Sequence, residues 1–269
     1  MKTIGLDVGS TSTKYVVLDD HVLLYYNVIP TGWSSVDAAS SAARDLRGRD
    51  IDVWEVPCVS TGYGRGAVAY ADKTVTEITC HGKGANYLFG NDRAMVIDIG
   101  GQDTKVISME GEIVLDFIMN DKCSAGTGRF LEVMANALGL NPASLCELAR
   151  RGSGVTISSM CTVFAESEVI SLIGQGIPKQ DIAYGIVDSI TSKVLSQCGK
   201  QDLCGGIYLT GGLCECPHVI ESLSKKLGVR VRTSALARYA GAAGAALCAQ
   251  KLGGKRVKKN ERASAPIHV

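Results

Sequence analysis

The sequence lacks a long apolar run, an excess of charge and a histidine-rich segment. No stretch approaches the roughly 20 apolar residues of a membrane helix, and the apolar residues 240–249 are rich in Ala and Gly, so we expect a packed helix there. The formal net charge is +1, which implies no nucleic-acid partner. Four histidines, none in a ligand-spaced pair, argue against a His-based metal hydrolase. The first residues show no signal-peptide pattern, so we expect a cytoplasmic protein that contacts no membrane.

Cysteine, in contrast, is abundant. The chain of 269 residues has ten cysteines and is 46% hydrophobic, enough to bury one large core or two modest ones. Secreted scaffolds with many cysteines are usually much smaller, so the thiols indicate a reducing compartment. We expect a few of them to have a metal or iron–sulfur role.

One motif occurs twice. Residues 4–14 read Ile-Gly-Leu-Asp-Val-Gly-Ser-Thr-Ser-Thr-Lys, and residues 96–105 read Val-Ile-Asp-Ile-Gly-Gly-Gln-Asp-Thr-Lys. Aligned on Asp7 and Asp98, both copies predict a buried strand, a tight glycine turn and a second strand. The glycine lets backbone N–H groups approach an anion closely, and a carboxylate at the strand end can hold hydrated Mg²⁺. The repeat therefore predicts two lobes that bind one polyphosphate.

The wider pattern alternates strands and helices in two similar halves. Each half is predicted to run strand-strand-strand-helix-strand-helix, which indicates two related α/β lobes. Strands are also predicted over residues 53–59 and 155–157. A third apolar strand ends at the pair Gly211-Gly212, where a flat base or ribose could lie against bare backbone.

The order of these three turns resembles the superfamily of actin, the heat-shock chaperone ATPases and the sugar kinases (ASKHA). The resemblance implies two ribonuclease-H-like lobes with a nucleotide cleft between them. We expect the first lobe to comprise residues 1–92 with the last helix at about 237–252, and the second to comprise residues 93–236. The tail, 253–269, is basic and poor in apolar residues, so we expect a flexible solvated end.

Two further cysteines stand ahead of predicted helices. Cys123 precedes a helix expected from about residue 128, and Cys161 precedes one expected from about residue 163. Unpaired N–H groups and the helix dipole stabilise negative charge at such positions, which suits thiolate ligands. A 4Fe–4S cluster needs four thiolates, and a two-fold homodimer would double two to four. The sequence therefore predicts one cluster shared by two chains.

These segments resemble the ATP-dependent activators of 2-hydroxyacyl-CoA dehydratases, relatives of the ATPase subunits of benzoyl-CoA reductase. The matching stretches are Thr61-Gly62-Tyr63-Gly64-Arg65, Glu77-Ile78-Thr79-Cys80-His81, residues 97–103, residues 120–130 and residues 157–168. The resemblance implies a homodimer whose 4Fe–4S cluster is held by Cys123 and Cys161. It also implies ATP hydrolysis, a low-potential electron passed to a separate iron–sulfur dehydratase or reductase, and reduced ferredoxin or flavodoxin as donor.

The expected nucleotide contacts follow from the turns and the resemblance together. Asp7 and Asp98 are expected to orient Mg²⁺ through water. Gln102 is the candidate to orient the attacking water, because its amide both donates and accepts hydrogen bonds. The remaining residues expected to bind ATP or ADP are Gly9, Ser10, Thr11, Ser12, Lys14, Gly100, Gly101, Asp103, Gly126, Thr127, Gly128, Gly211 and Gly212.

Other functions remain open at this stage. A small-molecule kinase of the same superfamily would need a carboxylate base, for which Asp116 or Asp121 could serve, and a filament-forming ATPase would leave the cysteines unused. Within the redox hypothesis the partner could also be an aryl-CoA reductase or another double-cluster protein.

Other metal sites also remain open. Cys123 and Cys161 could form a four-thiolate zinc site across a dimer, or be inert or disulfide-linked. Cys214 with Cys216, or Cys80 with His81, could hold a metal. The other thiols are expected to be core residues: Cys58, Cys146, Cys198, Cys204 and Cys248.

Overall fold

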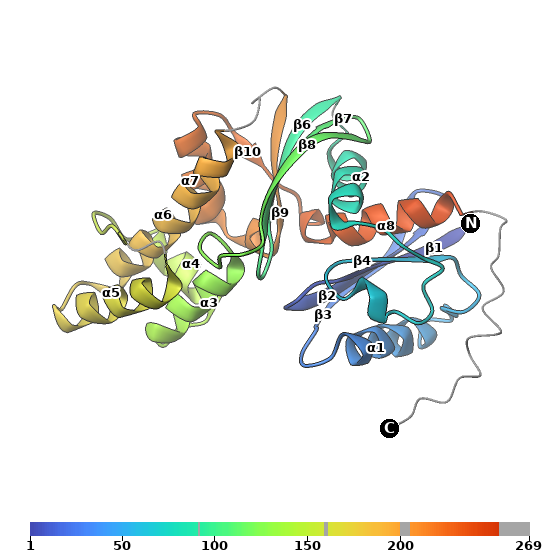
Figure 1. Ribbon diagram of the computed structural model, residues 1–269, viewed down its shortest axis with the longest axis horizontal. Helices are drawn as coiled ribbons and strands as arrows, with labels where there is room; N and C mark the ends of the chain where they lie inside the picture. Colours follow the sequence, from blue (N-terminus) through green and yellow to red (C-terminus); the bar gives the residue numbers. More distant parts are fainter. Residues whose placement is uncertain (91, 159–160, 200–204, 253–269) are drawn as a thin grey trace. The chain divides into compact units, whose positions relative to one another are not determined.

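The computed structural model describes residues 1–90, 92–158, 161–199 and 205–252. The predictions for Cys204 and for the tail 253–269 lie outside these residues. The chain divides into two compact units, Met1–Gly90 with Tyr239–Val269, and Asn91–Arg238 (Figure 1). In the part of the chain that the structure describes, no helix has the length and apolar character to span a membrane.

Unit 1 is built on a mixed sheet with the strand order β3-β2-β1-β4-β5. Strands β1 and β2 pair antiparallel, and β4 lies parallel to β1 on its other side. The elements of unit 1 are β1 (Lys2–Val8), β2 (Ser12–Asp19), β3 (Val22–Pro30), α1 (Ser35–Arg47), β4 (Cys58–Thr61), η1 (Arg65–Ala67), β5 (Lys73–Thr74), α2 (Glu77–Phe89) and α8 (Ala240–Gln250).

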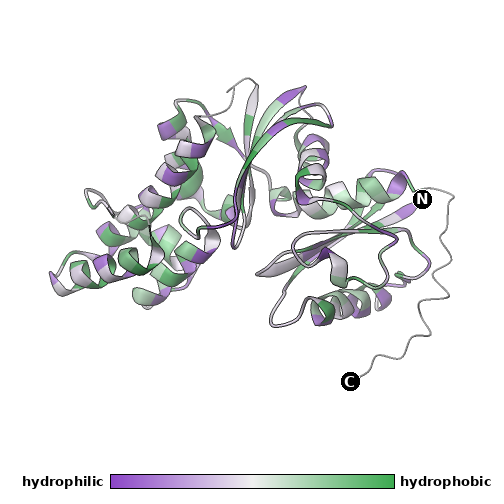
Figure 2. Ribbon diagram, in the orientation of Figure 1, coloured by the Kyte–Doolittle hydropathy of each residue, from purple (hydrophilic) through white to green (hydrophobic). Residues whose placement is uncertain are grey.

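Helices cover both faces of this sheet (Figure 1). Helix α1 begins at the N-cap Ser34, whose side chain accepts a hydrogen bond from the Asp37 backbone N–H. Its alanines and Leu46 pack on one face of β1 and β2. Helices α2 and α8 pack on the other face, where Ala242, Ala243 and Ala246 meet β2. Figure 2 shows α8 as mostly apolar, in keeping with its burial.

Glycine makes the contact between α8 and its neighbours possible. A Cβ on Gly5 of β1 would overlap the Ala242 carbonyl, and one on Gly244 of α8 would overlap the Cys80 carbonyl of α2. Backbone therefore packs directly on backbone at both places, which explains the Ala and Gly content of residues 240–249.

Replacing Gly244 with alanine should destabilise unit 1. The added methyl group meets backbone that cannot swing aside, so we expect a loss of about 3 kcal/mol, at the upper end for overpacking. Thermal unfolding measures this loss. Gly66→Ala is the matched control, since its Cβ meets nothing within 4 Å, and an equal destabilisation in both variants would contradict the close contact.

Unit 2 repeats the three-stranded start of unit 1 and adds more helices. Its sheet has the order β10-β9-β6-β7-β8, and β6 pairs antiparallel with β7 and parallel with β9. The elements of unit 2 are β6 (Arg93–Ile99), β7 (Thr104–Glu110), β8 (Ile113–Asn120), α3 (Gly128–Ala137), α4 (Pro142–Ala149), α5 (Thr162–Gly174), α6 (Lys179–Cys198), β9 (Gly206–Gly211), η2 (Gly212–Glu215), α7 (Pro217–Leu227) and β10 (Val231–Arg232); η3 (Ala237–Tyr239) spans the boundary between the units.

The core of unit 2 lies between its sheet and its helices, which Figure 1 shows on one side of the sheet. Helix α6 contributes a stripe of fully buried residues one turn apart, Ile182, Ile186, Ile190 and Val194.

Two strand predictions were wrong. Residues 155–157 form no strand, and of residues 53–59 only Cys58 and Val59 belong to β4. In both stretches the apolar side chains Val53 and Ile157 are buried from irregular backbone, so burial alone produced the strand-like pattern.

Candidate functional site

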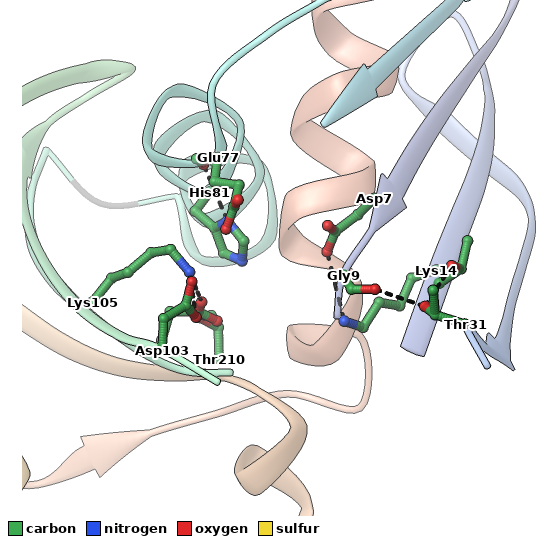
Figure 3. A network of polar contacts seen from close by, with 11 residues as sticks. Asp7, Gly9, Lys14, Thr31, Glu77, His81, Asp103, Lys105 and Thr210 are labelled. Atoms are coloured by element: carbon green, nitrogen blue, oxygen red, sulfur yellow. Dashed lines mark hydrogen bonds and ion pairs between the residues drawn. The ribbon is translucent and has the colours of Figure 1, made fainter. Parts of the chain in front are cut away.

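The first predicted phosphate turn, residues 8–13, closes the hairpin of β1 and β2. Asp7 is the buried penultimate residue of β1 and lies opposite Lys14 in the register. The Lys14 Nζ is 3.7 Å from Asp7 Oδ2, and both side chains are largely buried (Figure 3). The Gly9 backbone N–H donates to the Ser12 carbonyl at 3.2 Å and tightens the turn. The turn thus combines a carboxylate, an ammonium group and glycine backbone.

Two other segments of unit 1 hold this turn in place. The Thr31 hydroxyl donates to the Gly9 carbonyl at 2.7 Å, and the Thr31 backbone N–H donates to the Thr11 carbonyl at 3.0 Å. On the other side the Gly64 N–H donates to the Val8 carbonyl at 2.8 Å. Thr31 was not identified from the sequence, because nothing local marks a threonine that acts on a turn 22 residues away.

The second predicted phosphate turn, residues 99–104 in unit 2, has the same construction. Asp98 lies opposite Lys105 in the β6–β7 register, and the Gly100 N–H donates to the Asp103 carbonyl at 2.9 Å. The sequence repeat is therefore a structural repeat, with Gly9 and Gly100 in matching positions. One difference is chemical: Asp103 stands where the first turn has Ser12.

Two of the three charges at the second turn are almost completely buried: the side chains of Lys105 and Asp98 are 2% and 4% exposed, and that of Asp103 is 26% exposed. The Lys105 Nζ is 2.7 Å from Asp103 Oδ1 and 3.4 Å from Asp98 Oδ2 (Figure 3). The Thr210 hydroxyl donates to the other Asp98 oxygen, Oδ1, at 2.9 Å. Such a network fixes the direction of the Asp98 carboxylate. Gln102 projects from the same turn as an exposed residue.

The glycine pair that ends β9 adjoins the second turn. Gly211 has a φ of 80°, and a Cβ there would lie 2.8 Å from Asp98 Oδ1. At Gly212 a Cβ would meet nothing within 4 Å, so this backbone is open. A ligand could lie against it, as the sequence predicts for the base or ribose.

Residues 126–128 connect the second turn to α3. The Thr104 hydroxyl donates to the Gly126 carbonyl at 2.6 Å. The Gly128 N–H donates to the Gly100 carbonyl at 2.9 Å, and the Arg129 N–H to the Gly101 carbonyl at 2.7 Å. The start of α3 is thereby bonded to the turn, so a displacement of one moves the other.

Cys123 and Cys161, the two predicted cluster ligands, lie in one exposed region of unit 2. Both Cys123 and Cys161 are exposed thiols without a disulfide partner. The residues that follow them are joined, because the hydroxyl oxygens of Ser124 and Thr162 are 2.6 Å apart. Asn120 supports the first cysteine: its Nδ2 donates to the Cys123 carbonyl at 2.8 Å.

The helix-start prediction holds for one of these cysteines only. Cys161 is the N-cap of α5, as expected. Cys123 is not at a helix start, since α3 begins at Gly128 behind the N-cap Thr127. The intervening residues form the glycine turn at Gly126, whose φ of 81° is incompatible with a helix.

The other thiols named as metal candidates are inside the protein. Cys214 and Cys216 are buried, and burial raises the pKa of the Cys214 thiol to about 12. Cys80 is buried, and the His81 Nδ1 is 3.1 Å from the Glu77 carbonyl oxygen in the same helix. Among the described residues, no group of three or more His, Cys, Asp or Glu side chains could hold a metal ion. One chain thus presents two exposed cysteines together and no complete set of ligands in its described part.

Comparison with known proteins adds a family. The profile of the BadF/BadG/BcrA/BcrD ATPase family matches residues 4–249. The (R)-2-hydroxyglutaryl-CoA dehydratase activating ATPase of Acidaminococcus fermentans is 42% identical over 257 residues, which cover 94% of this chain and 98% of the relative. A benzoyl-CoA reductase subunit of Thauera aromatica is 32% identical over 212 residues, 75% of this chain and 72% of the relative.

Solved structures agree with the fold expectation. The activator of the 2-hydroxyisocaproyl-CoA dehydratase from Clostridium difficile, with bound ADPNP, superposes with a TM-score of 0.88 at 33% identity and covers 100% of both chains. A ROK family glucokinase from Streptomyces griseus gives a TM-score of 0.61 at 15% identity over 93% of this chain and 100% of that one, a likeness of fold alone. The predicted ASKHA-type α/β fold and the resemblance to the activators are confirmed.

Proposed function

The chain belongs to the BadF/BadG/BcrA/BcrD ATPase family, and on this basis we propose that it is an ATP-hydrolysing iron–sulfur activator of a 2-hydroxyacyl-CoA dehydratase. One observation carries the proposal. The Gly100 turn bonds to Gly126 and Gly128, and the segment that contains these glycines continues directly into Cys123. The segment that carries Cys123 is therefore hydrogen-bonded to the second predicted phosphate turn.

The cysteines fit half of a 4Fe–4S site. Two exposed thiols on adjoining segments supply two ligands, and the same two from a second copy complete the four that such a cluster needs. When bound, the cluster would supply a low-potential electron. Asn120 and the Ser124–Thr162 contact would hold the two thiols in place for it.

Helix α5 supports the homodimer. It begins at Cys161, and its exposed side includes Val163, Phe164, Ile170 and Ile173, which are 67%, 68%, 57% and 45% exposed. Large apolar side chains so exposed beside the cysteine favour contact with another protein surface. A second α5 across a two-fold axis would cover them and bring the two cysteine pairs together.

For the nucleotide, we assign the two phosphate turns to ATP and Mg²⁺. Asp7 and Asp98 orient the ion through water, and Lys14 balances the negative charge of the phosphates. Lys105 is buried and neutralises Asp98 and Asp103 within unit 2. Gln102, exposed on its turn, positions the attacking water. Backbone of the turns and of Gly211-Gly212 contacts the phosphates and the nucleoside. The support lies in the repeated turn geometry and in the open backbone at Gly212.

ATP hydrolysis would reach the cysteines through hydrogen bonds that the structure contains. A change at the Gly100 turn moves the start of α3 and, through Gly126, the segment that ends at Cys123. The Ser124–Thr162 contact passes that change to α5. We propose reduced ferredoxin or flavodoxin as electron donor. A benzoyl-CoA reductase or another double-cluster protein is the second candidate partner, favoured by the similarity to a benzoyl-CoA reductase subunit.

Placing a charge on α5 should separate the dimer. Phe164→Asp puts a carboxylate where the proposed contact is apolar, and we expect the dissociation constant to rise at least about 100-fold, which corresponds to roughly 3 kcal/mol. Analytical ultracentrifugation of anaerobically purified protein, together with iron analysis, measures the effect. The iron content should fall as the dimer dissociates, because one chain supplies only two of the four thiolate ligands.

A matched variant separates this effect from a general effect of charge. Val36→Asp introduces the same carboxylate at a similarly exposed apolar position, 54% exposed, on helix α1 of unit 1, and should leave dimer and iron unchanged. If the Phe164→Asp protein stays dimeric and keeps its full iron content, α5 is not part of the dimer interface.

A further inference from the structure

Two pairs of thiols lie inside the protein, away from Cys123 and Cys161. In unit 1, Cys80 of α2 and Cys248 of α8 share a hydrogen bond. In unit 2, Cys146 of α4 and Cys216, the N-cap of α7, share another. Both pairs join helices that are far apart in the sequence. The proposed function uses neither pair.

The two pairs differ in their access to solvent. Cys146 and Cys216 are both buried, each 6% exposed. Cys80 is fully buried, but Cys248 lies at the margin of its apolar cluster and is partly exposed. Cys248 is therefore the most exposed of these four cysteines, and both cysteines of the unit 2 pair are shielded from solvent.

Cys248 is also the more acidic thiol of its pair. The hydrogen bond from the Cys80 thiol, with the positive charges of Lys83, Lys251 and Lys73, lowers the pKa of Cys248, against the opposing effect of burial. The same hydrogen bond and burial raise the pKa of Cys80. The more acidic thiol of the pair is therefore also the one that is partly exposed, which suits thiol–disulfide exchange.

We propose that Cys80 and Cys248 form a redox-active dithiol that reacts with small disulfides of the glutathione type and closes into a bond between α2 and α8. The Cys248 thiolate attacks one sulfur of oxidised glutathione; the glutathione S–S bond breaks and one glutathione thiolate leaves. Cys80 then gives up its proton and attacks the Cys248 sulfur, and the second glutathione leaves. The two protein sulfurs lose two electrons, and one glutathione disulfide becomes two reduced glutathiones.

The proposed disulfide would lie where α2 and α8 are in closest contact. Helices α2 and α8 touch backbone to backbone at Gly84 and Gly244, and a Cβ on Gly244 would overlap the carbonyl of Cys80 itself, so Cys80 lies at the helix contact. At the same crossing, a Cβ on Gly241 would lie 2.8 Å from His81 Cε1 and 3.0 Å from Asp7 Oδ2. The dithiol therefore adjoins the helix contact that packs behind the carboxylate of the first phosphate turn.

The test uses the complete, anaerobically purified protein and oxidised glutathione. After incubation, remaining thiols are alkylated, the protein is digested without reductant, and the peptides are identified by mass spectrometry. We expect a Cys80–Cys248 linked peptide that dithiothreitol separates. The buried Cys146–Cys216 pair serves as an internal control and should react at least about tenfold more slowly, because its sulfurs are not accessible.

Single variants identify the order of the steps. Cys80→Ser should accumulate glutathione on Cys248, whereas Cys248→Ser should leave Cys80 unmodified. The parent protein alone can overturn the proposal: both thiols still alkylatable after prolonged oxidation, a mixed disulfide that persists on Cys248, or equal rates for the two pairs would each contradict it. The outcome does not depend on the identity of any cluster or partner enzyme.

Discussion

Replacing either Cys123 or Cys161 with serine is expected to abolish iron binding and the broad visible absorption of the anaerobically purified protein. A serine hydroxyl is a poor substitute for a thiolate, and in a shared site each substitution removes two of four ligands at once. We expect iron to fall from about four atoms per dimer to near zero. Both positions are exposed, so the thermal stability of each unit should change little.

A control keeps this result specific. Cys248→Ser changes the partly exposed cysteine of unit 1 and should retain full iron. Stoichiometric iron in either of the two site variants would refute the ligand assignment. Zinc in place of iron after strictly anaerobic purification would favour a four-thiolate zinc site instead.

Replacing Gln102 with alanine is expected to slow ATP hydrolysis by about 100-fold or more, with little change in nucleotide affinity. The side chain is exposed on the Gly100 turn, and positioning of water acts mainly on the transition state. Single-turnover hydrolysis and equilibrium binding of ATP separate the two quantities.

The matched control for Gln102→Ala is a glutamine on the surface of α6. Gln180→Ala removes an exposed amide from the first turn of a helix rather than from a phosphate turn and should hydrolyse ATP at the parental rate. Parental hydrolysis by Gln102→Ala would mean that another group positions the water.

The parts of the site that the sequence predicted are those encoded locally. The turn at Gly9 and the turn at Gly100 each depend on a buried strand, an aspartate and a glycine within a few residues. Periodicity and turn chemistry therefore sufficed to place both carboxylates and the fold around them. The sequence likewise predicted a closely packed helix over residues 240–249, because only small residues allow a helix to pack so closely.

The parts that the sequence did not predict depend on contacts between distant segments. Thr31 supports a turn that precedes it by an entire hairpin, and Cys248 meets Cys80 only because α8 returns to unit 1. The start of α3 near residue 128 was predicted correctly, but Cys123 lies ahead of the N-cap Thr127 and so is not at the helix start itself. Residues 155–157 were read as a strand because burial imitates its pattern.

The central claim is that the nucleotide at the phosphate turns changes the environment of the cysteine pair. The direct measurement compares iron release to a chelator, and the reduction potential, in anaerobic protein saturated with a non-hydrolysable ATP analogue or with ADP. The hydrogen bonds from the Gly100 turn through Gly126 to the Cys123 segment predict that the analogue speeds chelation at least about fivefold and shifts the potential, as expected for a coupling of about 1 kcal/mol or more. Identical chelation rates and potentials in the two nucleotides would contradict the claim.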